Sequence, residues 1–478
     1  MLLMRIILLV LLIQPVIVDS ASANAFSDRM AGINPPLDID FGFDTRIRQV
    51  TLHNATDFDN QSEAVMKLDT NFFRVRHRVW TKLKFNAGFN IYGRVTTEWR
   101  KYFDATYGTS ADQQATISYP NAEKSEIVWD NIYLDVPKLP LVPASLRVGR
   151  QDLIRGEGFV LLDGGPLDGS RTIYQNAILV GVDGGQLGWK DSKIDLFAIR
   201  NLARDRHIVH NDQKRQITEK DETAFGIYLQ NKSSFLNNES ESYYIYKAET
   251  NGNKDLFASF SSVSPAPARL PDTRIHTIGQ RMKGALPWSM SFALEGAIQT
   301  GSIHNPITRD KYADHQAYGG YLHLSRSFLM MLKPEIKAGC VLLSGDKQDT
   351  PDHEGWNPVF SRWPKWSELY IYSLLNDEKR IAYWQNLLMY HAGAKMSISK
   401  ELSLTYSYMH LAAPQSRLGT GKKRGSLHAW KFTAQISKSV ASHFLIESFH
   451  AGDFYLDPVT DSKKDVARFI RWELSVKK

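Results

Sequence analysis

Arginine recurs at every second position of one segment, as Arg74, Arg76 and Arg78, with Val75 and Val79 at the alternate positions. Side chains two residues apart on a β-strand point to the same face, so this spacing predicts a ladder of guanidinium groups. A guanidinium is permanently charged and can hold a carboxylate through two parallel hydrogen bonds. The chemistry that these residues predict is therefore the reversible binding of anions.

Basic residues of matching parity on other predicted strands extend this ladder. The residues that parity assigns to the same face are Arg74, Arg76, Arg78, Arg94, Arg100, Arg147, Arg281, Lys283, Lys333, Lys337, Lys395, Lys431 and Arg471. The acidic residues assigned to that face are Glu98, Asp135, Glu295, Glu335 and Glu473, so bases outnumber acids by more than two to one. This excess favours a surface that attracts anions. The alternative is that bases and acids on this face only pair for electrostatic balance.

The elements that would position these side chains are predicted by alternation of apolar and polar residues, which is typical of strands with one apolar face. Eighteen segments show it, an even number: 39–50, 70–83, 89–102, 126–136, 145–152, 171–183, 193–201, 222–231, 242–249, 274–284, 288–300, 316–325, 332–343, 382–396, 402–410, 428–437, 443–450 and 466–475.

The connections between these strands alternate in length. Short ones fall at 84–88, 137–144, 284–287, 326–331, 397–401 and 438–442, and long ones at 103–125, 153–170, 202–221, 250–273, 301–315, 344–381, 411–427 and 451–465. Short periplasmic turns and long extracellular loops are typical of bacterial transmembrane barrels. We therefore predict an all-β fold, a transmembrane antiparallel β-barrel of about 18 strands.

In such a barrel the apolar face contacts lipid and the charged face lines a water-filled lumen. An arginine on the lipid face near the midplane would cost about 2–4 kcal/mol, so parity assigns the strand arginines to the lumen.

The first residues indicate export. Residues 1–25 combine Arg5, an apolar run and small residues near Ala25, which is the pattern of a signal peptide. No later run of about 18 apolar residues predicts a membrane helix, so residues 26–478 are expected to form a single outer-membrane barrel domain. The net charge of +7 would suit nucleic acid, but export makes acidic sugars the better partner. Cys340 is the only cysteine, so no intramolecular disulfide can form.

No metal site or cofactor is predicted. His207 and His210 lie in a basic loop without a third ligand. Two acidic groups could hold calcium, although ordinary loop and turn chemistry explains them equally well, and they are Asp163 with Asp168, and Asp346, Asp349 and Asp352 with Glu354.

A membrane-embedded hydrolase is the alternative from another functional class. It would need a nucleophile or an activated water with histidine and carboxylate partners at a strand end. His323 and His391 have inward parity, but the sequence assigns no carboxylate to either. We therefore expect no catalytic residues and no enzymatic activity.

Two groups of motifs resemble a known family. The first is residues 146–153 (LRVGRQDL), followed by 156–158 (GEG) and 169–172 (GSRT). The second is 344–346 (SGD), followed by 356–358 (WNP) and 383–386 (YWQN). Both resemble the alginate export family of outer-membrane porins, and with the strand count the likeness covers most of the chain after residue 25.

This resemblance implies an eighteen-stranded monomeric barrel with an arginine-lined, anion-selective constriction, through which a polyuronate such as alginate leaves the periplasm. It adds Arg150 and Arg171 to the lumen candidates, and it implies that the loops 344–381 and 153–170 could gate the pore. Two departures stand out: the last strand does not end on an aromatic residue, and none of the short turns is long enough to plug the periplasmic side.

The function expected from the sequence is a passive outer-membrane channel for an acidic polysaccharide or oligosaccharide. Its expected partners are that sugar, outer-membrane lipid and a periplasmic export complex. The alternative is a general anion-selective porin for small acidic solutes.

Overall fold

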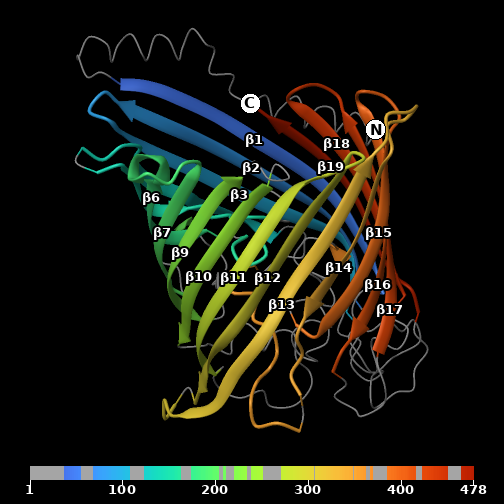
Figure 1. Cartoon of the computed structure of the whole chain (residues 1–478). Coiled ribbons are helices and arrows are strands. Elements are labelled where there is room, and N and C mark those ends of the chain that lie inside the picture. Colours follow the sequence, from blue (N-terminus) through green and yellow to red (C-terminus); the bar gives the residue numbers. More distant parts are fainter. Residues whose placement is uncertain are drawn as a thin grey trace.

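The computed structural model forms one closed antiparallel β-barrel (Figure 1). It describes residues 37–54, 68–107, 123–140, 142–162, 174–203, 208–210, 220–233, 238–250, 271–305, 307–347, 349–361, 367–369, 385–415, 423–450 and 465–478. The predicted signal peptide at 1–25 lies outside these residues. No helix in the described ranges is long and apolar enough to cross a membrane.

The eighteen wall strands occur in the order in which they pair. They are β1 (Leu37–His53), β2 (Leu68–Phe85), β3 (Phe89–Tyr107), β4 (Glu123–Val136), β5 (Ala144–Gln151), β6 (Gln175–Asp183), β7 (Ser192–Asn201), β9 (Asp221–Ser233), β10 (Asn238–Thr250), β11 (Asp272–Leu286), β12 (Met290–His304), β13 (Lys311–Ser327), β14 (Glu335–Leu343), β15 (Leu387–Ser397), β16 (Leu402–Ala413), β17 (Lys423–Gln435), β18 (Val440–His450) and β19 (Ala467–Lys477). A 3-10 helix, η1 (Gly184–Leu187), joins β6 to β7.

The barrel closes because β1 pairs on one side with β2 and on the other with β19, where Thr51 faces Ile470. Closure removes the free edges, so the strand backbone is satisfied within the protein, as lipid requires. The short strand β8 (Ile208–His210) pairs with β4 at Val128, on the side of β4 where β5 pairs farther along. The connection between β7 and β9 therefore returns to the wall.

All eighteen predicted strands are present, so the predicted fold is confirmed. The largest differences are at strand ends. The strand predicted at 332–343 begins only at Glu335, because Leu332 and Lys333 adopt positive φ in a turn. The long connection predicted at 301–315 is reduced to 305–310, since β12 and β13 extend into it.

The connections alternate as predicted. Turns such as 86–88, 287–289 and 436–439 lie at one end of the barrel, called here the short-turn end, and connections such as 152–174 and 344–386 lie at the other, the long-loop end.

The outer wall is apolar, with exposed side chains such as Val79, Ile178 and Ile298, whereas the compact hydrophobic cluster lies inside the barrel. Two long connections contribute to that cluster, together with inward side chains of the wall strands. Leu161 of the β5–β6 connection forms a parallel bridge with Phe360 of the β14–β15 connection, and both side chains are fully buried. The described parts of these two connections, 152–162 and 349–361, therefore fold into the barrel and pack on its inner wall.

The outward position of the apolar set is testable at Ile298, which is 63% exposed and lies near the middle of β12. Ile298→Arg should lower the free energy of unfolding by about 2–4 kcal/mol, the cost of a basic side chain at the membrane midplane. The measurement is urea unfolding in phospholipid vesicles. Ile307→Arg, at a residue in the β12–β13 connection that is 71% exposed, is the matched control and should change stability little. Equal effects of the two changes would contradict the assigned faces.

Candidate functional site

The predicted arginine ladder lies on the inner face of β2, and a second ladder on β1 lies beside it. The register sets Arg46 opposite Arg76 and Arg48 opposite Arg74, and all four side chains are buried. Like charges on adjacent positions repel, so each pair needs carboxylates nearby. Arg46 and Arg48 were not predicted from the sequence, although they flank the apolar Ile47 in the same period of two.

Carboxylates from neighbouring strands supply the counter-charges. Arg48 Nε lies 2.5 Å from Glu473 Oε2 of β19. Arg74 donates from Nε to Glu98 Oε1 at 2.8 Å and from Nη2 to Glu98 Oε2 at 3.2 Å, a bidentate pair. Arg48 and Arg74 are therefore each held by an acid on a neighbouring strand, which offsets the cost of removing their charge from water.

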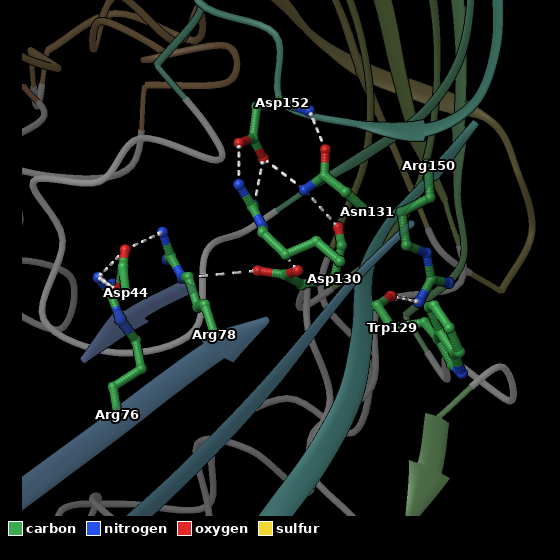
Figure 2. Close-up of polar contacts among 9 residues, drawn as sticks. Asp44, Arg76, Arg78, Trp129, Asp130, Asn131, Arg150 and Asp152 are labelled. Atoms are coloured by element: carbon green, nitrogen blue, oxygen red, sulfur yellow. Dashed lines mark hydrogen bonds and ion pairs between the residues drawn. The ribbon is translucent and has the colours of Figure 1, made fainter. Parts of the chain in front are cut away.

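A β-bulge in β4 brings a further acid into the lumen. The register shifts between Arg94 and Val95, so that Asp130 is an extra residue and points inward, where it is fully buried. Arg94 Nε donates to Asp130 Oδ1 at 2.8 Å, and Arg94 Nη1 lies 3.0 Å from Asp152 Oδ2 (Figure 2). Asn131 also donates to Asp152 Oδ1, at 2.9 Å, and so fixes that carboxylate.

Arg78 lies between two acids, Asp44 and Asp130, as Figure 2 shows. Its side chain is only 4% exposed, but both ion pairs are long, at 3.9 Å. Its Nε and Nη2 have no hydrogen-bond partner among the described residues. These two nitrogens form the edge through which Arg74 holds Glu98, so Arg78 presents an unfilled bidentate edge on the side of Asp130, whose Oδ2 lies 3.9 Å from Nε. Asp44, whose side chain is 32% exposed, approaches the other terminal nitrogen, Nη1.

The two arginines of β5 lie on opposite faces. Arg147 lies over the ring of Tyr133 and pairs with Asp135 at 3.0 Å, in the lumen as predicted. Arg150 is wrong as a lumen residue. It lies across from Ile132 and Asn176 on the outward face, donates to Trp129 O at 3.0 Å and stacks on Tyr174. Figure 2 shows Arg150 and Trp129 apart from the acidic residues.

The opposite wall holds a second network, around Arg281 on β11. Arg281 Nη1 lies 2.8 Å from Glu241 Oε1 and Arg281 Nη2 lies 3.7 Å from Glu157 of the β5–β6 connection. Glu295 accepts hydrogen bonds from Tyr243 and Tyr321, each at 2.9 Å. This wall therefore balances its base with several acids and tyrosine hydroxyls.

The β14–β15 connection also contributes an acid. Glu368 lies 2.5 Å from Arg471 of β19, and the backbone N–H groups of Glu368 and Leu369 donate to Glu447 of β18. Burial raises the pKa of Glu368, but Arg471 and then Arg48 lower it more, so the pKa lies below its ordinary value and the group is ionised. Residues 367–369 of this connection are thus held against β18 and β19 by an ion pair and hydrogen bonds.

The predicted lysines are less uniform. Lys283 pairs with Glu239 at 2.7 Å, and Lys337 pairs with Glu335 at 3.1 Å. Lys283, Lys337 and Lys395 together line a cavity of about 780 Å³. Lys431 shares the inward parity of the buried Leu427. Lys333 is wrong as a wall residue, because it lies in the turn between β13 and β14. Arg171 and the side chain of Arg100 lie outside the described residues.

The predicted excess of bases over acids by two to one is wrong for the described part of the lumen. Parity did not assign the acids that the bulge, additional strand positions and inward-folded connections contribute, which are Asp44, Asp130, Asp152, Glu157, Glu222, Glu241, Glu368 and Glu447. More of the basic side chains in the lumen are therefore paired with acids than the sequence indicated.

The residues that were considered for catalysis or metal binding, where the structure describes them, contact neighbouring side chains. His323 and His391 meet across Gly339, with Nδ1 and Nε2 2.8 Å apart. Glu354 binds Lys347 and Thr350 in its own loop, and these hydrogen bonds together outweigh burial and lower its pKa. The described residues contain no group of three or more metal-ligating side chains. His207, Asp163 and Asp168, and the side chain of His210, lie outside the described residues.

The paired network predicts an asymmetric response to substitution. Asp130→Asn should lower the free energy of unfolding by about 1–3 kcal/mol, because it removes one of the two acids beside each of the guanidinium groups of Arg78 and Arg94. Arg147→Met, at a side chain that is 35% exposed, should change it by no more than about 1 kcal/mol. Urea unfolding in detergent measures both. A loss for Arg147→Met that equals or exceeds the loss for Asp130→Asn would contradict the network.

Comparison with known proteins agrees with this architecture. The family model described as "Alginate export" matches residues 38–422. No curated protein matches the chain significantly.

Several solved porins share the fold. OccK5 (OpdH) of Pseudomonas aeruginosa is 11% identical with a TM-score of 0.52, over 92% of this chain and 98% of that one. OccAB3 of Acinetobacter baumannii is 8% identical with a TM-score of 0.55, over 92% and 99%. OccK2 (OpdF) of Pseudomonas aeruginosa, solved in complex with glucuronate, is 8% identical with a TM-score of 0.51, over 92% and 98%. At these identities the likeness concerns the fold.

Proposed function

This chain belongs to the alginate export family of outer-membrane channels, and from that premise we propose that it passes an acidic polysaccharide or oligosaccharide of the alginate type along its arginine-rich inner wall. The observation that carries the proposal is the unfilled edge of Arg78. A carboxylate of a uronic acid fits that edge as Glu98 fits Arg74, through two parallel hydrogen bonds.

The more exposed approach to Arg78 is at Nη1, beside Asp44. This carboxylate is the more exposed of the two acids beside Arg78, at 32% against fully buried Asp130, and it also holds Arg76 at 3.0 Å. A uronate carboxylate can take the place of Asp44 at Arg76 Nη2 and Arg78 Nη1 without leaving either guanidinium unpaired. Exchange of one carboxylate for another costs far less than removal of a counter-charge.

A polymer would move by repeating this exchange. Successive inward residues on one strand are roughly 7 Å apart, so Arg74, Arg76 and Arg78 form a series of similar steps. Conduction requires sites that bind well enough to admit a solute and weakly enough to release it. The protein's own acids provide that balance, because each competes with the passing carboxylate.

The two inward-folded connections fit the same scheme. Glu157 binds Arg281 and Glu368 binds Arg471, so each connection places a carboxylate on a lumen arginine. We propose that a polyuronate competes with these acids and loosens the connections as it passes, which is how loops 153–170 and 344–381 would gate a monomeric channel.

A general porin for small acidic solutes is the second candidate. The observation that favours it is the shared fold with OccK2, a porin solved with glucuronate. Both candidates need the arginines, but only a polymer spans several of them at once and gains from multivalency. Polyuronate should therefore block the current at concentrations where its monomer has no effect, if the first candidate is right.

Planar-bilayer conductance tests the proposed role of Arg78. Arg78→Lys keeps the charge but loses the bidentate edge, so anion preference should persist while block by alginate oligomers weakens about tenfold. Arg78→Gln should reduce both. Arg150→Gln, on the outward face, is the control and should reduce neither.

Neutralising Arg74, Arg76 and Arg147 together should lower the anion-to-cation permeability ratio. Cation preference of the unaltered channel, or an anion preference that survives the triple change, would overturn the proposed function. Circular dichroism of each variant confirms that the barrel is formed before its conductance is interpreted.

A further inference from the structure

Three aromatic side chains form a row across the inner wall, next to the arginine network and on its short-turn side. The rings of Trp80 on β2 and Tyr92 on β3 have centroids 6.1 Å apart and planes 23° apart. Tyr92 and Tyr133 on β4 follow at 4.9 Å and 18°, and the guanidinium of Arg147 on β5 lies 4.6 Å from the centre of the Tyr133 ring. Each ring therefore stacks on the ring of the next strand, and the guanidinium of Arg147 continues the stack.

A glycine on β1 makes room for the first ring. Gly42 faces Trp80 in the β1–β2 register, and a Cβ at that position would lie 2.6 Å from Trp80 Cζ2. The indole therefore covers the backbone of β1, an arrangement in which an aromatic ring shields a strand glycine. With Arg147 at the other end, the row spans the inner wall from β1 to β5.

In this row the aromatic side chains are more exposed than nearby polar ones, the opposite of the ordinary distribution. Trp80, Tyr92 and Tyr133 are all partly exposed, whereas the charged and polar neighbours two residues away on the same strands include Arg78 and Asn131, which are buried at 3% and 2% exposure. If the rings only filled space, we would expect the rings to be buried and their polar neighbours to be exposed. Partly exposed rings in a water-filled lumen instead form a surface for a solute with an apolar face.

A pyranose ring is such a solute. Its C–H groups on one face carry partial positive charge and match the negative face of an aromatic ring, while its hydroxyl groups remain in water. Arg147 adds a charge at the end of the row. Its side chain is 35% exposed, against 5%, 4% and 11% for Arg74, Arg78 and Arg94, and its partner Asp135 lies 3.0 Å away.

From this geometry we infer that Trp80, Tyr92 and Tyr133 form a sugar-ring subsite, with Arg147 placed to bind the carboxylate of a uronic acid. The subsite lies between the short-turn mouth and Arg94, so a chain that enters from the periplasm meets it before the buried arginines. The rings recognise the sugar whether or not it is charged, and Arg147 adds the preference for acid. The acidic class of sugar rests on the proposed function, but the recognition of a pyranose does not.

The test uses two kinds of blocker in planar bilayers, added on the short-turn side of the full-length channel. Neutral maltohexaose reports the rings alone, and oligomers of alginate report the rings together with Arg147. The variant Tyr92→Leu with Tyr133→Leu should weaken block by both sugars about tenfold, the order expected for loss of stacking on aromatic rings, with chloride selectivity unchanged. Arg147→Gln should weaken block by the alginate oligomers only.

Two controls separate recognition from folding. Tyr92→Phe with Tyr133→Phe keeps the rings and should keep the block, and Trp430→Leu alters an aromatic residue on the outer wall, 42% exposed, and should change nothing. If the double leucine variant does not assemble, Trp80→Leu alone takes its place with the same expectation.

Unchanged block by maltohexaose in the leucine variant, or failure of maltohexaose to block the unaltered channel, would overturn the subsite. If maltohexaose blocks through the rings while alginate oligomers neither block nor permeate, the proposed function fails and the subsite stands.

Discussion

A strand in lipid must find a partner for every backbone N–H and C=O group within the protein, and the pairing of β1 with β19 completes that requirement for this chain. Once the barrel is closed, the period of two assigns each side chain to lipid or to the lumen. Arginines that alternate with valines on β2 can then only face inward. The charge of the lumen is thus a consequence of closure, and the pairing of that charge is the problem that the rest of the inner wall solves.

The solution combines acids from several sources. Strand neighbours provide Glu98 and Glu473, a bulge turns Asp130 inward, and the long connections bring Glu157 and Glu368 into the barrel. A buried guanidinium paired with a carboxylate contributes little net stability but is costly to leave alone. A carboxylate that replaces one of these acids leaves no guanidinium unpaired, and so the network that balances the wall also suits a channel for acidic solutes.

The sequence predicted what depends on local periodicity: the eighteen strands, the alternation of turns and loops, and the inward parity of Arg74, Arg76, Arg78 and Arg147. It could not predict what depends on departures from that period. The bulge at Asp130 adds one residue and changes which side chains face inward, and positive φ at Lys333 ends the strand. Arg150 followed its parity outward, against the assignment based on the family motif. The inward positions of the acids in the connections could not be predicted, because a loop residue meets its partner only through the tertiary fold. Glu368, for example, pairs with Arg471, 103 positions away in the sequence.

The aromatic row escaped sequence analysis for a related reason, since Trp80, Tyr92 and Tyr133 are each unremarkable in strands whose outer faces are also rich in aromatic residues. Only the register shows that they adjoin, and only Gly42 shows that the first ring lies against the wall. Their place beside the arginines has a physical rationale. A charged wall alone attracts every anion and holds none in a defined orientation, whereas stacking on a ring fixes the plane of a sugar before its carboxylate reaches a guanidinium. Rings of modest affinity at the mouth and exchangeable ion pairs beyond it would let a long acidic sugar enter without trapping it, because neither kind of contact need be strong by itself.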